Sequence, residues 1–291
     1  MIIDIHTHTF PDKIAAGAVS HLQQSSHIAL FSDGTEGGLG RNEKRAGVDL
    51  AVVQPVATNP DKVTRMNDYV FQTNRRTAET GVLSFGAMHP AFQGWEGELE
   101  RLKGENVKGV KLHPPYAGIP IDDPRAIAIL KKCRELGLVV LIHSGKDVGL
   151  PGADQALPVH IRRALDAAGP VKLIAAHMAG WACWEEAERL LADTGIYLDT
   201  AFSLGRITPA PDGFPWEEKH LRMLDNAAAC HLIRAFGPER VLFGTDSPWG
   251  DPAAEIEKIK SLPLSQQEKE AILGENARRL LLGSSQVRSE E

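Results

Sequence analysis

Residues 138–144 have the sequence Leu-Val-Val-Leu-Ile-His-Ser, in which five apolar residues are followed by a histidine and a serine. A short run that is apolar on both faces is typical of a strand covered on both sides, as in a parallel sheet. The amphipathic segment 124–136 precedes it and stops at Gly137, and a second amphipathic segment follows at 155–168. Glycine commonly ends helices. The stretch therefore predicts a helix, a buried strand with a polar carboxyl end, and another helix.

The same unit recurs along the chain. Regular alternation of strands and helices implies a parallel sheet, and eight such units in 291 residues favour a single-domain α/β fold closed as a (β/α)8 TIM barrel. No glycine-rich dinucleotide fingerprint or P-loop follows a strand to favour an open sheet. We expect strands at 2–6, 48–55, 82–88, 107–112, 138–143, 171–177, 196–200 and 240–245, and helices that include 64–80, 95–104, 124–136, 155–168 and 183–194.

Two stretches interrupt this rhythm. Residues 25–42 are rich in glycine and residues 203–219 are rich in proline, and both are too long for simple connectors. We expect loop insertions there that form lids or pocket walls. The barrel is expected to span 1–283, and the Ser- and Glu-rich segment 284–291 is expected to be a flexible tail.

The composition limits the classes of molecule that the protein is expected to bind. The formal net charge is −6, so no basic surplus is present to neutralise nucleic acid or an anionic membrane surface. The cysteines Cys133, Cys183 and Cys230 show no paired spacing, and the chain opens on a strand pattern without a leader-like segment. We therefore expect a cytoplasmic protein, with no nucleic-acid or membrane partner, that acts on a small molecule. A homodimer would be ordinary for such a barrel.

Polar side chains end most of the predicted strands. His6 and His8 are two residues apart, so on an extended strand both point to one face, where they can share an ion. A lone histidine is more often a hydrogen-bonded core residue, but the repetition predicts a divalent metal centre at the C-terminal face, with zinc first and manganese, iron or nickel as alternatives. The residues at strand ends are His6, His8, His89, Lys111, His113, His143, His177, Asp199 and Asp246.

These motifs resemble the amidohydrolase superfamily, and most of all its aminocarboxymuconate-semialdehyde decarboxylase-like branch of TIM-barrel metal-dependent hydrolases. The resemblance rests on His6-x-His8, on His143 and His177, and on Gly244-Thr-Asp-Ser-Pro-Trp249. It extends over nearly the whole chain, including 109–114 and 276–281.

The resemblance implies roles for individual residues. It makes His6, His8, His143 and Asp246 the ligands of one metal, with His177 close by as an acid, a base or an oxyanion stabiliser. Binuclear relatives carry a carboxylated lysine or a glutamate on strand four, near Lys111. One metal is favoured, and Lys111, His113 and His177 remain candidates for a second metal or for substrate binding.

Hydrolysis is the activity that we expect. A bound divalent ion lowers the pKa of its water to about 7 and polarises the carbonyl of a small ester, lactone or amide. Asp246 would accept the proton of the water, and His177 would stabilise charge or donate a proton. Trp249 could wall the pocket, and Arg206 or Lys111 could bind a substrate carboxylate, although a solvated loop charge is commoner for Arg206.

Two alternatives stay open. The same ligands serve decarboxylases and hydratases that act on small unsaturated or aromatic carboxylic acids. Some decarboxylase relatives carry glutamate in place of the first histidine, so His6 favours hydrolysis. A non-catalytic metal-binding barrel is the remote alternative.

Overall fold

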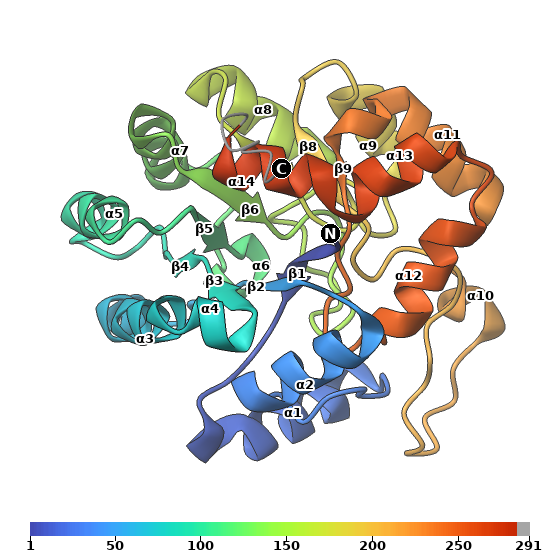
Figure 1. Cartoon of the computed structure of the whole chain (residues 1–291). Helices are drawn as coiled ribbons and strands as arrows, with labels where there is room; N and C mark the ends of the chain where they lie inside the picture. Colours follow the sequence, from blue (N-terminus) through green and yellow to red (C-terminus); the bar gives the residue numbers. More distant parts are fainter. Residues whose placement is uncertain (284–291) are drawn as a thin grey trace, which may run out of the picture.

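The computed structural model describes residues 1–283, and the predicted tail 284–291 lies outside the described residues. A parallel barrel occupies the centre and helices surround it (Figure 1). This confirms the predicted TIM barrel. The strands are β1 (Ile3–Thr7), β2 (Leu50–Val53), β3 (Val82–Ser84), β4 (Gly86–Ala87), β5 (Gly109–Leu112), β6 (Val139–Ile142), β7 (Leu173–Ala175), β8 (Tyr197–Asp199) and β9 (Val241–Leu242).

The strands form two hydrogen-bonded sets, β1-β2-β3 and β4 to β9 in chain order. β3 and β4 are two pieces of the predicted strand 82–88, separated by Phe85, which donates its backbone N–H to the Val53 carbonyl (3.0 Å). The barrel closes between its first and last strands. There Ile5 donates its N–H to the carbonyl of Phe243 (2.9 Å), and Thr7 forms a parallel bridge with Ser247.

The residues of β6, which are apolar on both faces, pack on both sides of the sheet. Val139 and Leu141 of β6 lie in the cluster inside the barrel, whereas Val140 and Ile142 pack in the larger cluster between the sheet and the helices. Both faces of β6 are buried for this reason. His143 continues the inward-facing positions of Val139 and Leu141, so the alternation carries it to the mouth of the barrel.

The predicted helices are confirmed with small shifts of their ends. Segments 95–104 and 124–136 are α5 and α7, 155–168 begins at Pro158, 183–194 ends at Leu191, and 64–80 is divided in two. The helices are α1 (Asp12–Ser26), α2 (Glu36–Ala46), α3 (Val63–Arg75), α4 (Thr77–Thr80), α5 (Trp95–Gly104), α6 (Pro114–Ala117), α7 (Pro124–Leu136), α8 (Pro158–Ala168), α9 (Trp184–Leu191), α10 (Glu218–Leu221), α11 (Asn226–Phe236), α12 (Pro252–Ser261), α13 (Gln266–Glu270) and α14 (Asn276–Leu282).

The prediction of a loop over 25–42 was partly wrong, because only 27–35 lies between helices there. Helix α2 begins at Glu36 despite its glycines. Thr35 caps it by accepting the N–H of Gly38 (2.9 Å). A Cβ on Gly38 would collide with the carboxylate of Asp33, so the glycine permits a close approach that the sequence alone did not reveal.

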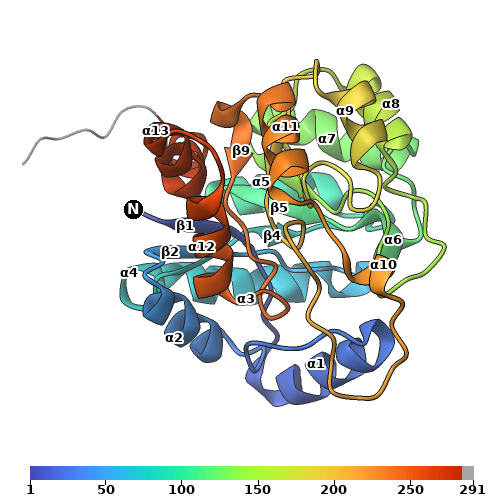
Figure 2. The ribbon, with the colours of Figure 1, turned by 90° about the vertical axis from the view of Figure 1, so that its right-hand side faces the viewer.

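The two irregular segments pair with each other at the carboxyl side of the barrel. Ala29 donates its N–H to Thr208 and Ala210 donates to His27, each over 2.9 Å, and Figure 2 shows the long loop that leads to α10 running beside α1. We call residues 27–31 and 207–212 the strap. Ile28 and Ile207 of the strap form a separate apolar cluster with Phe202 and Leu221, and Trp181, Trp216 and Trp249 pack against it.

The opposite end of the barrel is closed by α14. Its Ala277 and Leu281 pack in the same cluster as Ile3 and Ile5. No helix within residues 1–283 is long and apolar enough to cross a membrane.

Candidate metal centre

His6 reaches the interior of the barrel through an irregularity in β1. Asp4 pairs with Ala51 and Thr7 with Val53, so β1 carries one extra residue over that interval. Such a bulge re-aims a side chain. Ile5 packs inside the barrel, and simple alternation would turn His6 outward, but the bulge turns His6 inward as well. The His6 N–H is accepted by the buried Asp4 carboxylate (3.0 Å).

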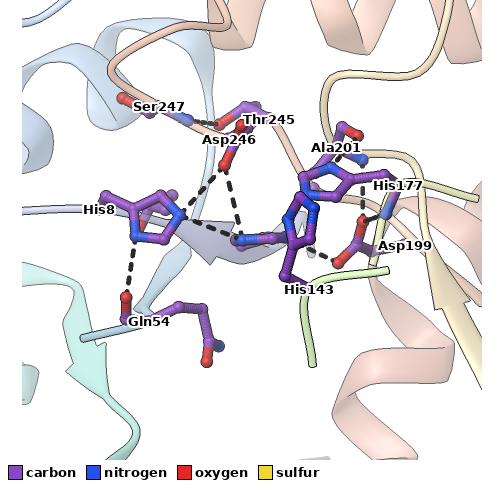
Figure 3. Close-up of polar contacts among 12 residues, drawn as sticks. His8, Gln54, His143, His177, Asp199, Ala201, Thr245, Asp246 and Ser247 are labelled. Atoms are coloured by element: carbon purple, nitrogen blue, oxygen red, sulfur yellow. Dashed lines mark hydrogen bonds and ion pairs between the residues drawn. The ribbon is translucent and has the colours of Figure 1, made fainter. Parts of the chain in front are cut away.

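Asp246 meets His6 and His8 at the closing seam of the barrel. Its Oδ1 atom lies 3.1 Å from His8 Nε2 and 3.5 Å from His6 Nε2, and the two Nε2 atoms are 3.2 Å apart. Figure 3 shows the Asp246 carboxylate facing the His8 ring. Asp246 has a φ of 61°, an uncommon value for a residue with a side chain. Strain of this kind concentrates at functional sites.

His177 occupies a second strained turn. It follows β7 with a φ of 59°, and Met178 and Ala179 are also left-handed. The Asp199 carboxylate accepts the backbone N–H of His177 over 2.8 Å. The turn places His177 Nε2 at 3.1 Å from Nδ1 of His143. The centres of the His6 and His177 rings are 5.2 Å apart.

The sequence-predicted ligands therefore come together in two adjoining sets. His6, His8 and Asp246 form one compact group of donor atoms. His143 forms a pair with His177 beside that group rather than belonging to it.

In the imidazoles of His6, His8, His143 and His177, a hydrogen bond to the nitrogen that points away from the centre sets the orientation of the ring. His8 Nδ1 faces the Gln54 carbonyl (2.8 Å), His143 Nε2 the Lys146 carbonyl (3.1 Å) and His177 Nδ1 the Ala201 carbonyl (2.9 Å). His6 Nδ1 faces Asp199 Oδ2 (2.8 Å). A carbonyl oxygen only accepts, so these outer nitrogens carry the proton in the neutral rings. Each inner nitrogen then presents a lone pair, the arrangement found around metal-ligating histidines.

This donor set fits a divalent cation. Metal–ligand bonds of about 2.1 Å separate neighbouring donors by about 3.4 Å in a tetrahedron and about 3.0 Å in an octahedron. The separations of 3.1 and 3.2 Å from His8 Nε2 to Asp246 Oδ1 and to His6 Nε2 fall in that range, and the 3.5 Å from His6 Nε2 to Asp246 Oδ1 lies just above it. Lone pairs that face one another at 3.1 Å, as in His143 and His177, repel unless a cation lies near them.

Electrostatics keep the rings of His6, His143 and His177 neutral. Burial lowers the pKa of His143 and His177 to about 3 and the pKa of His6 well below its usual value, with the nearby Lys111 ammonium contributing. Neutral imidazole is the form that binds metal. Burial raises the pKa of Asp199, whereas the His177 N–H and the Lys111 ammonium favour its carboxylate form.

Lys111 lies beside the group formed by His6, His8 and Asp246. It is 1% exposed, and its Nζ is 3.2 Å from His6 Nε2, so it donates toward that lone pair. Burial lowers the pKa of Lys111 to about 8. The structure thus brings Lys111 to the centre, as the sequence predicted.

His113 lies one layer farther out. Its ring stacks on His143 with centroids 4.5 Å apart, and its Nε2 is 3.6 Å from Asp147 Oδ2. His113 Nδ1 accepts the Tyr116 N–H (3.4 Å), so the neutral ring carries its proton on Nε2. That proton leaves Nε2 without a lone pair for a second metal. Sequence reasoning missed Asp147, whose signal is its position in the loop just after His143.

Of the two predicted substrate-binding residues, the structure places one in the site. Trp249 lies 5.7 Å from His8, ring centre to ring centre. Arg206 is exposed and forms an ion pair with Glu218 on the strap side of the molecule. His89 does not contact the histidines and aspartate of the candidate metal centre. Its Nδ1 accepts the N–H of Ala91 (3.1 Å).

A closed parallel barrel with histidines and an aspartate at the carboxyl ends of its strands defines a class of TIM-barrel enzymes with the active site at that face. The chain belongs to the amidohydrolase family, whose model matches residues 3–282. The resemblance inferred from the sequence is thereby confirmed. No curated protein matches the chain in sequence.

Solved structures share the fold at low identity. A 2,6-dihydroxybenzoate decarboxylase in complex with 2,6-dihydroxybenzoate is 14% identical, with a TM-score of 0.68 and coverage of 97% of this chain and 99% of that one. A dihydroxybenzoic acid decarboxylase from Polaromonas, with bound manganese and the inhibitor 2-nitroresorcinol, is 14% identical, with a TM-score of 0.67 and coverage of 97% and 96%. A candidate 2-pyrone-4,6-dicarboxylic acid hydrolase from Pseudomonas putida is 17% identical, with a TM-score of 0.64 and coverage of 97% and 98%.

Proposed function

We propose that this amidohydrolase-family enzyme is a metal-dependent hydrolase of a small ester, lactone or amide. The observation that carries the proposal is the convergence of inward-facing acceptor atoms, the Nε2 atoms of His6 and His8 and Oδ1 of Asp246. We propose that these three residues hold one divalent cation, zinc or manganese, and that His143 of the adjoining His143–His177 pair supplies a fourth ligand. Such a cation lowers the pKa of bound water and polarises a carbonyl.

His177 and Asp246 are arranged as proton acceptors, whereas Lys111 is a donor. His177 presents Nε2 as a lone pair because its Nδ1 proton is directed to Ala201. Asp246 is the carboxylate beside it, 14% exposed and therefore reachable from the mouth. Hydrolysis begins by removing a proton from water, so a site lined with acceptors suits it. Trp249 and the apolar cluster that includes strap residues would exclude bulk water from the reacting carbonyl.

Decarboxylation of a small aromatic acid is the second candidate. The buried Lys111 amine favours it, because an ammonium beside His6 can bind a carboxylate or supply the proton that replaces the departing carbon dioxide. Two of the similar structures described above are also decarboxylases of dihydroxybenzoic acids. At 14% identity these structures support the candidate only through the shared fold.

One experiment decides between them. The purified protein, stripped with a chelator and reloaded with zinc or manganese, is assayed against aryl esters, lactones and amides for acid release and against dihydroxybenzoates for carbon dioxide release. Hydrolysis that disappears on chelation and returns with metal supports the proposal. Carbon dioxide release without hydrolysis refutes it in favour of decarboxylation.

The matched pair of variants is Asp246→Asn and Asp251→Asn. Asp251 caps α12 a few residues farther along, and asparagine caps helices equally well. The first substitution should abolish turnover and the second should leave it unchanged. Equal activity of the two variants would remove Asp246 from the site.

A further inference from the structure

Asp199, at the end of β8, connects two parts of the metal centre. It is fully buried. Its Oδ1 accepts two backbone N–H groups, from His177 over 2.8 Å and from Ala201 over 3.2 Å. Its Oδ2 lies 2.8 Å from Nδ1 of His6. One carboxylate thus contacts both the ring of His6 and the strained turn that carries His177, as Figure 3 shows for the turn.

His6 differs from its three neighbours in what holds its outer nitrogen. The outer nitrogens of His8, His143 and His177 face backbone carbonyls, which accept a proton in every side-chain variant. His6 alone among these four rings has a side chain as the hydrogen-bond partner of its outer nitrogen, since the Asp147 carboxylate lies 3.8 Å from His143 Nε2, beyond hydrogen-bond distance. The tautomer of His6 therefore depends on the chemical nature of residue 199, which faces Nδ1, and on the Lys111 amine, which faces Nε2.

We propose that Asp199 is a positioning residue that fixes the proton of His6 on Nδ1, so that Nε2 is free to bind the metal, and that it holds the ring in register with the His177 turn. The inference rests on the proposed metal function of the site. It adds a residue that touches neither the substrate nor the metal and that acts only through the two histidines.

The geometry predicts which tautomer of His6 the Asp199→Asn substitution selects. Two N–H donors occupy the position of Oδ1, so the amide oxygen of asparagine must stay there. The amide NH2 group then faces His6 Nδ1. Because that group only donates, Nδ1 becomes an acceptor and the proton of the neutral ring moves to Nε2. The variant keeps the shape of the site and loses one ligand lone pair. The corresponding substitution in a Ser-His-Asp triad also leaves geometry intact and selects the wrong tautomer.

Comparison with Asp199→Ala separates this role from a structural one. Alanine removes the acceptor without imposing a tautomer, so the metal can still select the Nδ1–H form. We expect zinc affinity to fall about 10- to 100-fold in Asp199→Asn, in the range found for lost partners of metal-ligating histidines, and to fall less in Asp199→Ala. A residue that only packs the core would give the opposite order, since truncation costs more than an isosteric change.

The experiment uses the full chain with 15N-labelled histidine. Long-range 1H–15N spectra of the metal-free protein report which nitrogen of His6 is protonated, and zinc titration against a competing chelator reports affinity. Asp199→Asn should shift the His6 proton to Nε2. Asp4→Asn is the matched control, because Asp4 is equally buried and contacts the His6 backbone but not its ring, and the proton should stay on Nδ1.

Two results would overturn the proposal, namely a His6 proton that stays on Nδ1 in Asp199→Asn, or zinc affinity lower in the alanine variant than in the asparagine variant. Because the spectra are recorded without metal or substrate, they stand apart from the test of hydrolysis. Failure to hydrolyse esters would refute the proposed function and leave the tautomer result in place.

Discussion

Replacing Glu43 with glutamine should stabilise the protein, and the gain should grow as the pH rises. Glu43 lies on α2 and is 3% exposed, and neither carboxylate oxygen has a hydrogen-bond partner within residues 1–283. Burial raises its pKa to about 9, and the carboxylates of Asp4 and Asp251 add to the shift. The folded protein therefore keeps this acid protonated under conditions in which the unfolded chain ionises it.

The size of the effect follows from linkage. With an unfolded pKa of 4.5 and a folded pKa of about 9, the folded state binds one more proton between these values. Stability then falls as the pH rises, by about 1.4 kcal/mol per pH unit. From pH 5 to pH 8 the loss of folding free energy amounts to about 4 kcal/mol. Part of this loss belongs to Asp4, because burial raises its pKa to about 7 and the two carboxyl groups interact. Glutamine cannot ionise, so Glu43→Gln removes the part that belongs to residue 43.

Urea unfolding of the wild type and Glu43→Gln at pH 5, 6.5 and 8 measures this difference. Glu257→Gln is the control, because Glu257 is exposed and its ion pair with Lys260 lies at the surface. The free-energy gain of Glu43→Gln should be near zero at pH 5 and largest at pH 8, with Glu257→Gln nearly flat. A gain for Glu43→Gln that does not change with pH would refute the reasoning.

Three further outcomes are expected. Asp246→Asn should lower kcat by about 100- to 10,000-fold with an unchanged circular dichroism spectrum, and near-normal kcat would contradict its role. Gly145→Ala should cost about 1–3 kcal/mol in urea unfolding, since φ is +86° and the new Cβ would meet the Trp181 backbone; an unchanged midpoint would show that the turn can relax. Arg206→Ala should leave KM almost unaltered, because Arg206 is engaged with Glu218 at the surface, and a large rise in KM would instead place it at the substrate.

The barrel was predictable because its signals are local. The stretch 138–144 is apolar on both faces, and the same pattern at the other strands implies parallel pairing. The sequence also predicted that the polar residues at the strand ends lie close together, because the carboxyl ends of parallel strands meet at one face. Lys111 was located in this way, and its Nζ lies 3.2 Å from His6 Nε2; Trp249 was named for its place near a strand end, and its ring centre lies 5.7 Å from that of His8.

What the sequence could not give depends on backbone geometry and long-range partners. Two-residue spacing predicted that His6 and His8 share a face, but only the bulge in β1 turns that face inward. Of the supporting carboxylates, Asp4 was not predicted, and Asp199 was noted at a strand end without a role. Their partners are far away in the sequence, so no local motif marks them. Arg206 was chosen for its charge, and its neighbour Glu218 satisfies that charge instead.

The central claim is that His6, His8 and Asp246 hold one divalent metal, and metal content measured with matched variants tests it most directly. Elemental analysis after equilibrium dialysis against zinc or manganese should give about one ion per chain for the wild type. The ion should be lost in His8→Asn and kept in His21→Asn, whose histidine is exposed on α1. A wild type that binds no metal, or a His8→Asn protein that binds it as tightly as the wild type, would contradict the account.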